Sequence, residues 1–167
     1  WPQRRNAWPR VWRMPVDVAF EGRSYPPSEP YAVGREAIRA FAAAVGAGSA
    51  LHHDVAAARA AGYPDLVAPP TFAVVIAQRC EAQYVTDPAA GIDFTRVVHA
   101  EERFESAHPL IAGTEVVATL HVEKVRLVGG HGMVTTRVEL SAADGAAAGS
   151  TALGQVTSML VIRGTDE

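Results

Sequence analysis

The stretch "PDLVAPPTFAVVIAQRCEAQYVTDP", residues 64–88, decides the fold. Two prolines and a threonine precede about four turns of mostly apolar residues, which predicts a helix starting near Pro70 or Thr71 and extending to about Val85. Because its first turns are apolar nearly all round, this helix is expected to be buried and not laid on the surface. The rest of the chain must therefore supply a surface that covers it.

The segments that follow Thr95 are expected to supply that surface, because their apolar residues recur at every second position. The segments "TRVVHAEERFES", "EVVATLHVEKVRLV", "GMVTTRVELSA" and "STALGQVTSMLVIRG" are separated by turn signals in "AHPLIAGT", "GGHG" and "ADGAAAG". In the second segment Val116, Ala118, Leu120 and Val122 point to one side. The pattern predicts an α+β architecture in which four long antiparallel strands wrap one central helix.

Two shorter helices are expected before the central one. "YAVGREAIRAFAAAVG", residues 31–46, passes from a short strand-like run into a helix with an apolar face, and two glycines end it. A second helix is predicted over residues 54–61, with Asp54 as its N-cap and Gly62 as its stop. The adjacent His52 and His53 therefore fall at a loop-to-helix junction.

The bulk composition is that of one ordinary globular domain. The chain has 167 residues, of which 49% are apolar and 20% charged, and no apolar run approaches the ~18 residues that span a bilayer. The single cysteine, Cys80, lies in the apolar helix, where a buried and inert thiol is expected. These features favour a cytoplasmic protein.

Residues 1–13, "WPQRRNAWPRVWR", differ from the rest. They hold four arginines, no acid and all three tryptophans. We interpret them as a non-core N-terminal extension and residues 14–167 as the single domain; a basic arm for nucleic acid is the alternative. Removing those four charges from the net of −3 leaves −7 for the domain, which disfavours general nucleic-acid binding.

The order of these elements, with the segments "LHHDVAAARAAGYPDLVAPPTFAVVIAQ", "GIDFTRVVHAEERFES" and "HPLIAGTEVVATLHVEKV", resembles the MaoC-like hotdog dehydratases. It is most similar to their amino-terminal-domain branch, which includes the small actinobacterial (3R)-hydroxyacyl-ACP dehydratase subunits of the A and C type. The resemblance runs from about Gly22 to Gly164.

The resemblance implies a hotdog fold, a homodimer or a heterodimer with another hotdog subunit, and no cofactor. It also implies removal of water from 3-hydroxyacyl chains held as thioesters on acyl carrier protein or coenzyme A, which gives the trans-2-enoyl thioester. In the small-subunit branch, one chain often shapes the acyl tunnel while a different hotdog chain supplies the catalytic residues.

The catalytic stretch of the family, Asp-x-Asn-Pro-x-His, corresponds here to "AGSALH", residues 47–52. Ala47 stands at the aspartate position and Ser49 at the asparagine position, so only His52 is retained. Histidine suits proton transfer near neutral pH. His52 is therefore the first catalytic candidate.

Two further residues are candidates to replace the aspartate that is missing at position 47. Ser49 can donate a hydrogen bond without ionising, although a serine in "GAGSA" is also an ordinary loop residue. Asp54 can orient His52, although its expected helix-capping role explains it without chemistry. His53 is expected to face solvent because consecutive residues point in different directions.

The start of the central helix departs from the family as well. The His-Gly often found there corresponds to Pro69-Pro70, and proline has no N–H to stabilise an oxyanion, so the next free amide is that of Thr71. The acyl site is expected to be lined or backed by residues of this helix start: Pro70, Thr71, Phe72, Val75 and Ile76.

The remaining histidines indicate no metal site. His99 lies on a predicted strand, where structural hydrogen bonding is expected, and His108, His121 and His131 have no metal-ligand spacing. No glycine-rich phosphate loop or nucleophile elbow is present in the sequence.

Three functions remain open at this point: a catalytic component of a dehydratase, a non-catalytic tunnel-forming subunit of a heterodimer, and a hotdog acyl-thioesterase, since one fold serves both reactions. An acidic carrier protein would need a local basic patch, which folding has to assemble from five arginines: Arg23, Arg35, Arg39, Arg59 and Arg79.

Overall fold

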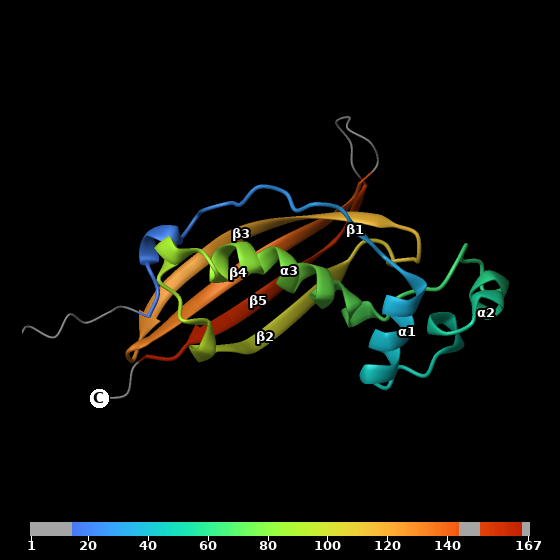
Figure 1. Ribbon diagram of the computed structural model, residues 1–167, viewed down its shortest axis with the longest axis horizontal. Coiled ribbons are helices and arrows are strands. Elements are labelled where there is room, and N and C mark those ends of the chain that lie inside the picture. Colours follow the sequence, from blue (N-terminus) through green and yellow to red (C-terminus); the bar gives the residue numbers. More distant parts are fainter. Residues whose placement is uncertain (1–14, 144–150, 165–167) are drawn as a thin grey trace, which may run out of the picture.

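A single antiparallel sheet forms the body of the protein (Figure 1). The computed structural model describes residues 15–143 and 151–164, so the extension proposed for residues 1–13 lies outside the described residues. The strand order is β1-β3-β4-β5-β2. The strands are β1 (Tyr31–Ala32), β2 (Val97–Ser106), β3 (Glu115–Val128), β4 (His131–Ala142) and β5 (Ala152–Ile162).

The helices agree closely with the sequence pattern. They are α1 (Arg35–Ala44), α2 (Val55–Ala60) and α3 (Ala73–Val85), with short 3₁₀ turns at η1 (Val18–Phe20), η2 (Ala50–His52), η3 (Pro70–Phe72), η4 (Pro88–Ala90) and η5 (Phe94–Arg96). The helix start expected near Pro70 is confirmed as the 3₁₀ turn η3, which leads into α3. None of the helices in the described part of the chain is long and apolar enough to cross a membrane.

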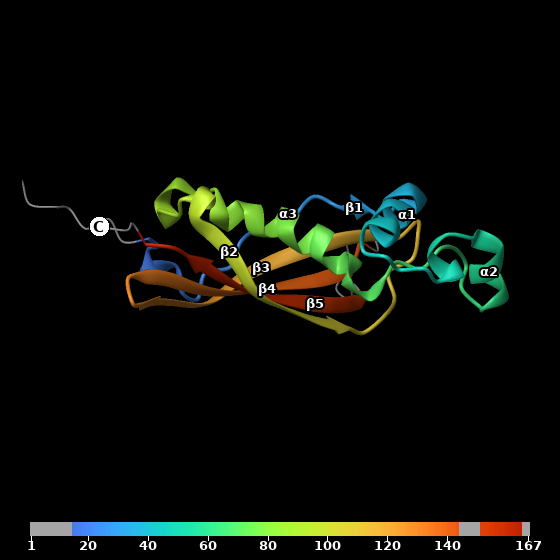
Figure 2. The ribbon, with the colours of Figure 1, turned by 90° about the horizontal axis from the view of Figure 1, so that it is seen from below.

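The helix α3 lies across one face of the sheet (Figure 2). Its inward side chains are buried against alternating residues of β3, where Val116, Ala118, Leu120 and Val122 are all at most 1% exposed, as the period of two predicted. A sheet that curls around one helix in this way confirms the expected α+β hotdog fold.

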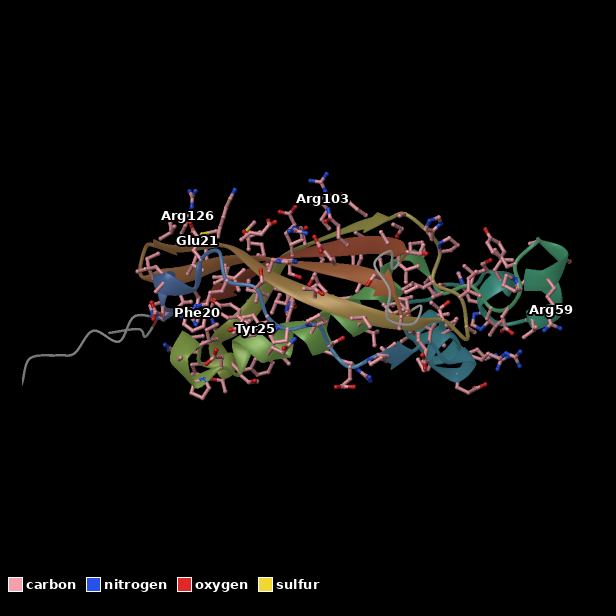
Figure 3. All side chains as sticks on the ribbon, turned by 90° about the horizontal axis from the view of Figure 1, so that it is seen from above. Phe20, Glu21, Tyr25, Arg59, Arg103 and Arg126 are labelled. Atoms are coloured by element: carbon pink, nitrogen blue, oxygen red, sulfur yellow. The ribbon has the colours of Figure 1, made fainter. Side chains whose placement is uncertain are left out.

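Residues 15–30 run over the C-terminal half of α3. Phe20 and Tyr25 place their rings 5.7 and 6.2 Å from the ring of Tyr84 on α3, and Figure 3 shows both on the side of the sheet where α3 lies. The hydroxyl of Tyr25 donates to Asp87, 3.1 Å away. This aromatic contact closes one end of the core.

An overhang, defined as residues 35–66 with α1, η2 and α2, extends beyond one end of the sheet (Figure 1). It is attached through the edge-to-face contact of Phe41 with Phe72, whose ring centroids are 5.4 Å apart. The backbone N–H of Val67 also donates to Leu51 O at 3.0 Å. The overhang is therefore held against the start of α3.

The expected inert cysteine is confirmed. Cys80 on α3 is 1% exposed, and its thiol donates to Ala118 O at 3.5 Å. Burial raises the pKa of this thiol, so the reactive thiolate is disfavoured.

A row of polar side chains, three of them buried and one, Glu102, half-buried, crosses the apolar face of the sheet beneath α3. Glu81, on α3 and 2% exposed, accepts a hydrogen bond from Thr136 Oγ1 at 2.6 Å, and Glu102 on β2 accepts one from Ser158 Oγ at 2.9 Å. Thr136 and Ser158 are fully buried and face each other across β4 and β5. A carboxylate taken from water is unfavourable unless it is paired or protonated, and burial raises the pKa of Glu102 in this row.

We predict that Glu102→Gln removes a pH-dependent loss of stability. Burial raises the pKa of the Glu102 carboxyl, although the Ser158 hydrogen bond opposes this shift. Folding therefore favours the protonated carboxyl, and the stability it contributes is lost as pH rises from the ordinary carboxyl pKa through the raised value. The free energy of unfolding of Glu102→Gln, relative to the native chain, should increase over that interval in urea titrations.

The matched control is Glu101→Gln, which changes an exposed carboxylate on the same strand. Its free energy of unfolding should follow that of the native chain at each pH. A Glu102→Gln difference that stays constant with pH would contradict the assignment.

Candidate active site

His52 is held in place by a hydrogen bond to the approach of α3. It is the last residue of η2 and is 9% exposed, and its ring Nδ1 lies 2.6 Å from Val67 O. Since a carbonyl only accepts, Nδ1 carries the proton in the neutral ring. The structure gives Nε2 no hydrogen bond to a described residue, which leaves its lone pair for a ligand.

His52 forms one wall of a cavity of about 510 Å³. The overhang contributes Ser49 and Leu51, and the approach to α3 contributes residues 67–70 and Ala73. The opposite walls come from the end of β2 and the turn after it, residues 104–110, and from Leu140 and residues 153–155. A mostly apolar cavity with a few convergent polar groups is the usual form of a small-molecule site.

The other residues expected beside His52 have structural partners. Ser49 lines the cavity and also caps η2, where its hydroxyl accepts from Leu51 N at 3.4 Å. Asp54 caps α2 by accepting from Ala56 N at 2.8 Å, and it does not line the cavity. His53 is exposed, and its Nε2 donates to Ala47 O at 3.0 Å. The N-cap role that the sequence predicted for Asp54 is therefore confirmed.

The residues expected at the acyl site are separated by the fold. Pro70 lines the cavity, and Thr71 is exposed without lining it. Phe72 and Ile76 are at most 2% exposed in the core, and Val75 borders a different hollow beside β2. Among the five, only Pro70 shares the cavity with His52.

Sequence patterns missed the far wall of the cavity. His108 lines it, because the N–H groups of Ala107 and His108 both donate to Leu153 O, at 2.9 and 3.1 Å. Glu105 lines it as well, but its carboxylate is held by Gln155 at 2.9 Å and lies 3.3 Å from Arg103. This wall depends on contacts between the end of β2 and the start of β5, which are about 45 residues apart in the chain. A pattern of neighbouring residues cannot predict such contacts.

The arginines do not form one patch. Arg35, Arg39 and Arg59 lie on the overhang, whereas Arg23 and Arg79 lie over the rings of Phe20 and Tyr31. Arg35 holds Asp65 through two hydrogen bonds of 2.8 and 2.6 Å, and this contact lowers the pKa of Asp65 to about 2. Figure 3 shows Arg59 near the free end of the overhang.

A family model described as the FAS1-like dehydratase domain region matches residues 19–149. The chain belongs to this family. UPF0336 proteins of Saccharopolyspora erythraea and Leifsonia xyli are 42% and 46% identical to it, over 92% of the chain and 96% and 99% of their own lengths.

The fold comparison gives the same family. The chain is similar to a MaoC-like dehydratase, with a TM-score of 0.76 and 28% identity over 89% of the chain, and it spans 43% of that protein. It is also similar to a chain of the HadBC (3R)-hydroxyacyl-ACP dehydratase complex of Mycobacterium tuberculosis, with a TM-score of 0.72 and 27% identity over 89% of this chain and 99% of that one. The expected hotdog dehydratase family is thereby confirmed.

We predict opposite tautomers for the two adjacent histidines. At a pH above the range in which histidine titrates, His52 should carry its proton on Nδ1, because that atom faces Val67 O. His53 should carry it on Nε2, because that atom faces Ala47 O. Long-range ¹H–¹⁵N correlation spectra of the labelled protein distinguish the two forms, and an Nε2–H tautomer at His52 would contradict the site geometry.

Proposed function

We propose that the chain is a component of a (3R)-hydroxyacyl-thioester dehydratase and that His52 performs its acid/base chemistry. The observation that carries the proposal is the fixed tautomer of His52 in the wall of a mostly apolar cavity: Nδ1 donates to Val67 O, and Nε2 has no hydrogen bond to a described residue and so can act on the substrate. Membership of a dehydratase family supports the reaction class.

The reaction can be written with one histidine. The Nε2 lone pair takes the proton from C2 of the thioester, and the electrons of that C–H bond form the C2–C3 double bond as the C3–O bond breaks. The leaving hydroxyl accepts a proton and departs as water. When both groups lie on one face of the substrate, the protonated Nε2 is the donor, so the missing carboxylate at Ala47 is not an absolute requirement.

The carrier in this proposal is acyl carrier protein or coenzyme A, in fatty-acid or polyketide metabolism. Both carry phosphate, and carrier proteins are acidic, but Arg39 of the overhang is already paired with Glu36, so Arg59 near the free end of the overhang is the better placed cation for them. The cavity is lined by apolar side chains at Leu110, Leu140 and Leu153, which suit an acyl chain.

A second function rests on two observations of its own. Position 47 holds alanine, and residues 69 and 70 are prolines, so the site lacks the usual carboxylate and the N–H that proline cannot supply. Losing one oxyanion donor typically costs ~10²–10³ in rate. The alternative is therefore a tunnel-forming subunit whose hotdog partner performs the chemistry, and the HadBC and ChsH1–ChsH2 complexes show this fold in two-chain assemblies.

We predict that His52→Ala lowers turnover by ~10²–10⁴, because it removes the group that moves the proton. The assay is the loss of ultraviolet absorbance when an enoyl thioester is hydrated, with the chain alone and with each hotdog chain encoded in the same genome. The matched control is His53→Ala, which removes the exposed neighbouring ring and should leave turnover within about twofold.

The outcomes separate the functions. Unchanged turnover for His52→Ala in an active complex contradicts catalysis by His52 and favours the tunnel-forming subunit. Release of free thiol from an acyl thioester, without change in the enoyl absorbance, indicates a thioesterase instead.

A further inference from the structure

The turn after β2 brings a second histidine to the cavity that holds His52. Three titratable side chains line this cavity: His52, Glu105 and His108. Glu105 is already engaged, because Gln155 donates to its carboxylate and Arg103 lies 3.3 Å from it. The ring of His108 makes no hydrogen bond or ion pair with any described residue. His108 is therefore the one group of the three whose structural role is unexplained.

The backbone register brings His108 to the approach of α3. An isolated antiparallel bridge pairs Val67 with Ile111, and the backbone hydrogen bonds on either side of it follow the same register. Antiparallel partners run in opposite directions, so this register carried three residues further sets Pro70 opposite His108. Both of these residues line the cavity.

Proton abstraction from C2 creates a need that a single base cannot meet. As His52 takes the proton, negative charge develops on the oxygen of the thioester carbonyl. A hydrogen-bond donor within about 3 Å of that oxygen stabilises the charge, and such donors are often the largest single contribution to catalysis of this kind.

The backbone of the cavity wall has few N–H groups to offer this oxygen. Three prolines of the wall carry no N–H: Pro69, Pro70 and Pro109. Other N–H groups of the wall already donate to oxygen atoms of the protein, namely those of Leu51, Val67, Ala68, Ala107 and His108. A side chain is therefore the better source of the donor.

Two side chains of the cavity can serve, because Gln155 already donates to Glu105. They are the hydroxyl of Ser49, on the overhang with His52, and the ring of His108, on the far wall. The Ser49 hydroxyl is held by its cap of η2, where it accepts from Leu51 N. The His108 ring has no such tie.

The direction of the substrate favours His108. A carrier protein or coenzyme A remains outside the cavity, so the thioester lies near the opening and the acyl chain extends toward the buried side chains of Leu110, Leu140 and Leu153. His108 is exposed and also lines the cavity, which places it at the opening. Its ring is thus nearer the carbonyl than the end of the acyl chain.

We propose that His108 is a catalytic residue of this site, and that its ring N–H donates to the carbonyl oxygen of the thioester while His52 takes the proton from C2. The inference rests on the proposed function and adds a residue to the same site. The electrons of the C2–H bond move toward the carbonyl oxygen and then form the C2–C3 double bond as the C3–O bond breaks. His108 keeps its own proton throughout, and the leaving hydroxyl receives the proton that His52 took.

The first test reads the carbonyl directly and needs no turnover. Cinnamoyl-coenzyme A absorbs in the near ultraviolet, and a hydrogen bond to its carbonyl shifts this absorption to longer wavelength because it draws electrons along the conjugated system. The full chain is titrated into the probe, alone and with the hotdog chains used in the hydration assay. We expect a red shift with the native chain and with His52→Ala. His108→Ala should remove the shift while the probe still binds in equilibrium dialysis.

The second test is kinetic. In a complex that hydrates an enoyl thioester, His108→Ala should lower kcat by ~10²–10³ with a smaller change in KM, because the lost interaction strengthens in the transition state. His108→Gln retains a side-chain donor and should recover at least tenfold of that loss and part of the red shift. The control is His131→Gln, which changes an exposed histidine at the start of β4 and should keep kcat within about twofold.

The outcomes separate this inference from the function on which it rests. It is overturned if the native chain gives no red shift, if the shift survives His108→Ala, or if only Ser49→Ala removes it. When turnover depends on His52 but is unchanged in His108→Ala, the proposed function stands without His108. When the red shift depends on His108 but no complex hydrates the enoyl thioester, the carbonyl contact stands and the proposed function fails.

Discussion

Burial of α3 is the constraint on which the rest of the structure depends. A helix with buried residues from Ala73 to Val85 cannot stand in water, and the sheet formed by β1 to β5 covers it on one side. Residues 15–30 cover its C-terminal half. The overhang packs against the N-terminal end of α3, and the cavity lies at this junction.

The geometry of His52 follows from that arrangement. The chain has to cross from the overhang to α3, and Val67 on this crossing bonds in two directions: its N–H donates to Leu51 O, and its carbonyl accepts from the ring of His52. The adjacent Ala68 N–H donates to Leu110 O at 2.8 Å. One backbone segment therefore fixes the catalytic candidate and joins it to the far wall of the cavity.

The C-terminal half of α3 buries polar side chains as well as apolar ones. Glu81 is buried in a helix that packs on an apolar sheet face, where it accepts from Thr136. The neighbouring Ser158 donates to Glu102, so the polar row ends at the edge strand β2. Buried polar groups contribute specificity only when they are fully satisfied, and Glu102 Oε1 is not. The two ends of α3 thus have different surroundings: a mostly apolar cavity with His52 lies at its start, and the carboxylates of Glu81 and Glu102 lie toward its end.

Local patterns predicted the elements well because they depend on neighbours in sequence. The proline start before α3, the period of two in β3 and the Asp54 cap all depend on residues within a few positions, and the structure confirms each of them.

The features that local patterns missed depend on contacts between distant segments. A β-bulge between His99 and Glu101 turns His99 and Glu102 to one face, and it becomes visible only when β2 is paired with β5. His108 joins the cavity only because Leu153 accepts from its backbone. Pro70 and Phe72 lie in η3, whereas Val75 and Ile76 lie in α3. Because successive side chains on a helical turn face different surroundings, Phe72 and Ile76 are buried in the core and Val75 borders the hollow beside β2.

The most direct measurement of whether this chain performs chemistry uses a complex in which only His52 remains as an acid/base group. In the assembled complex, the acid/base residues of the partner are replaced, and an enoyl thioester is hydrated in D₂O while mass spectrometry follows deuterium at C2. The account predicts continued turnover with one deuterium at C2, lost on replacing His52 by alanine. No deuterium incorporation while His52 is intact would contradict it.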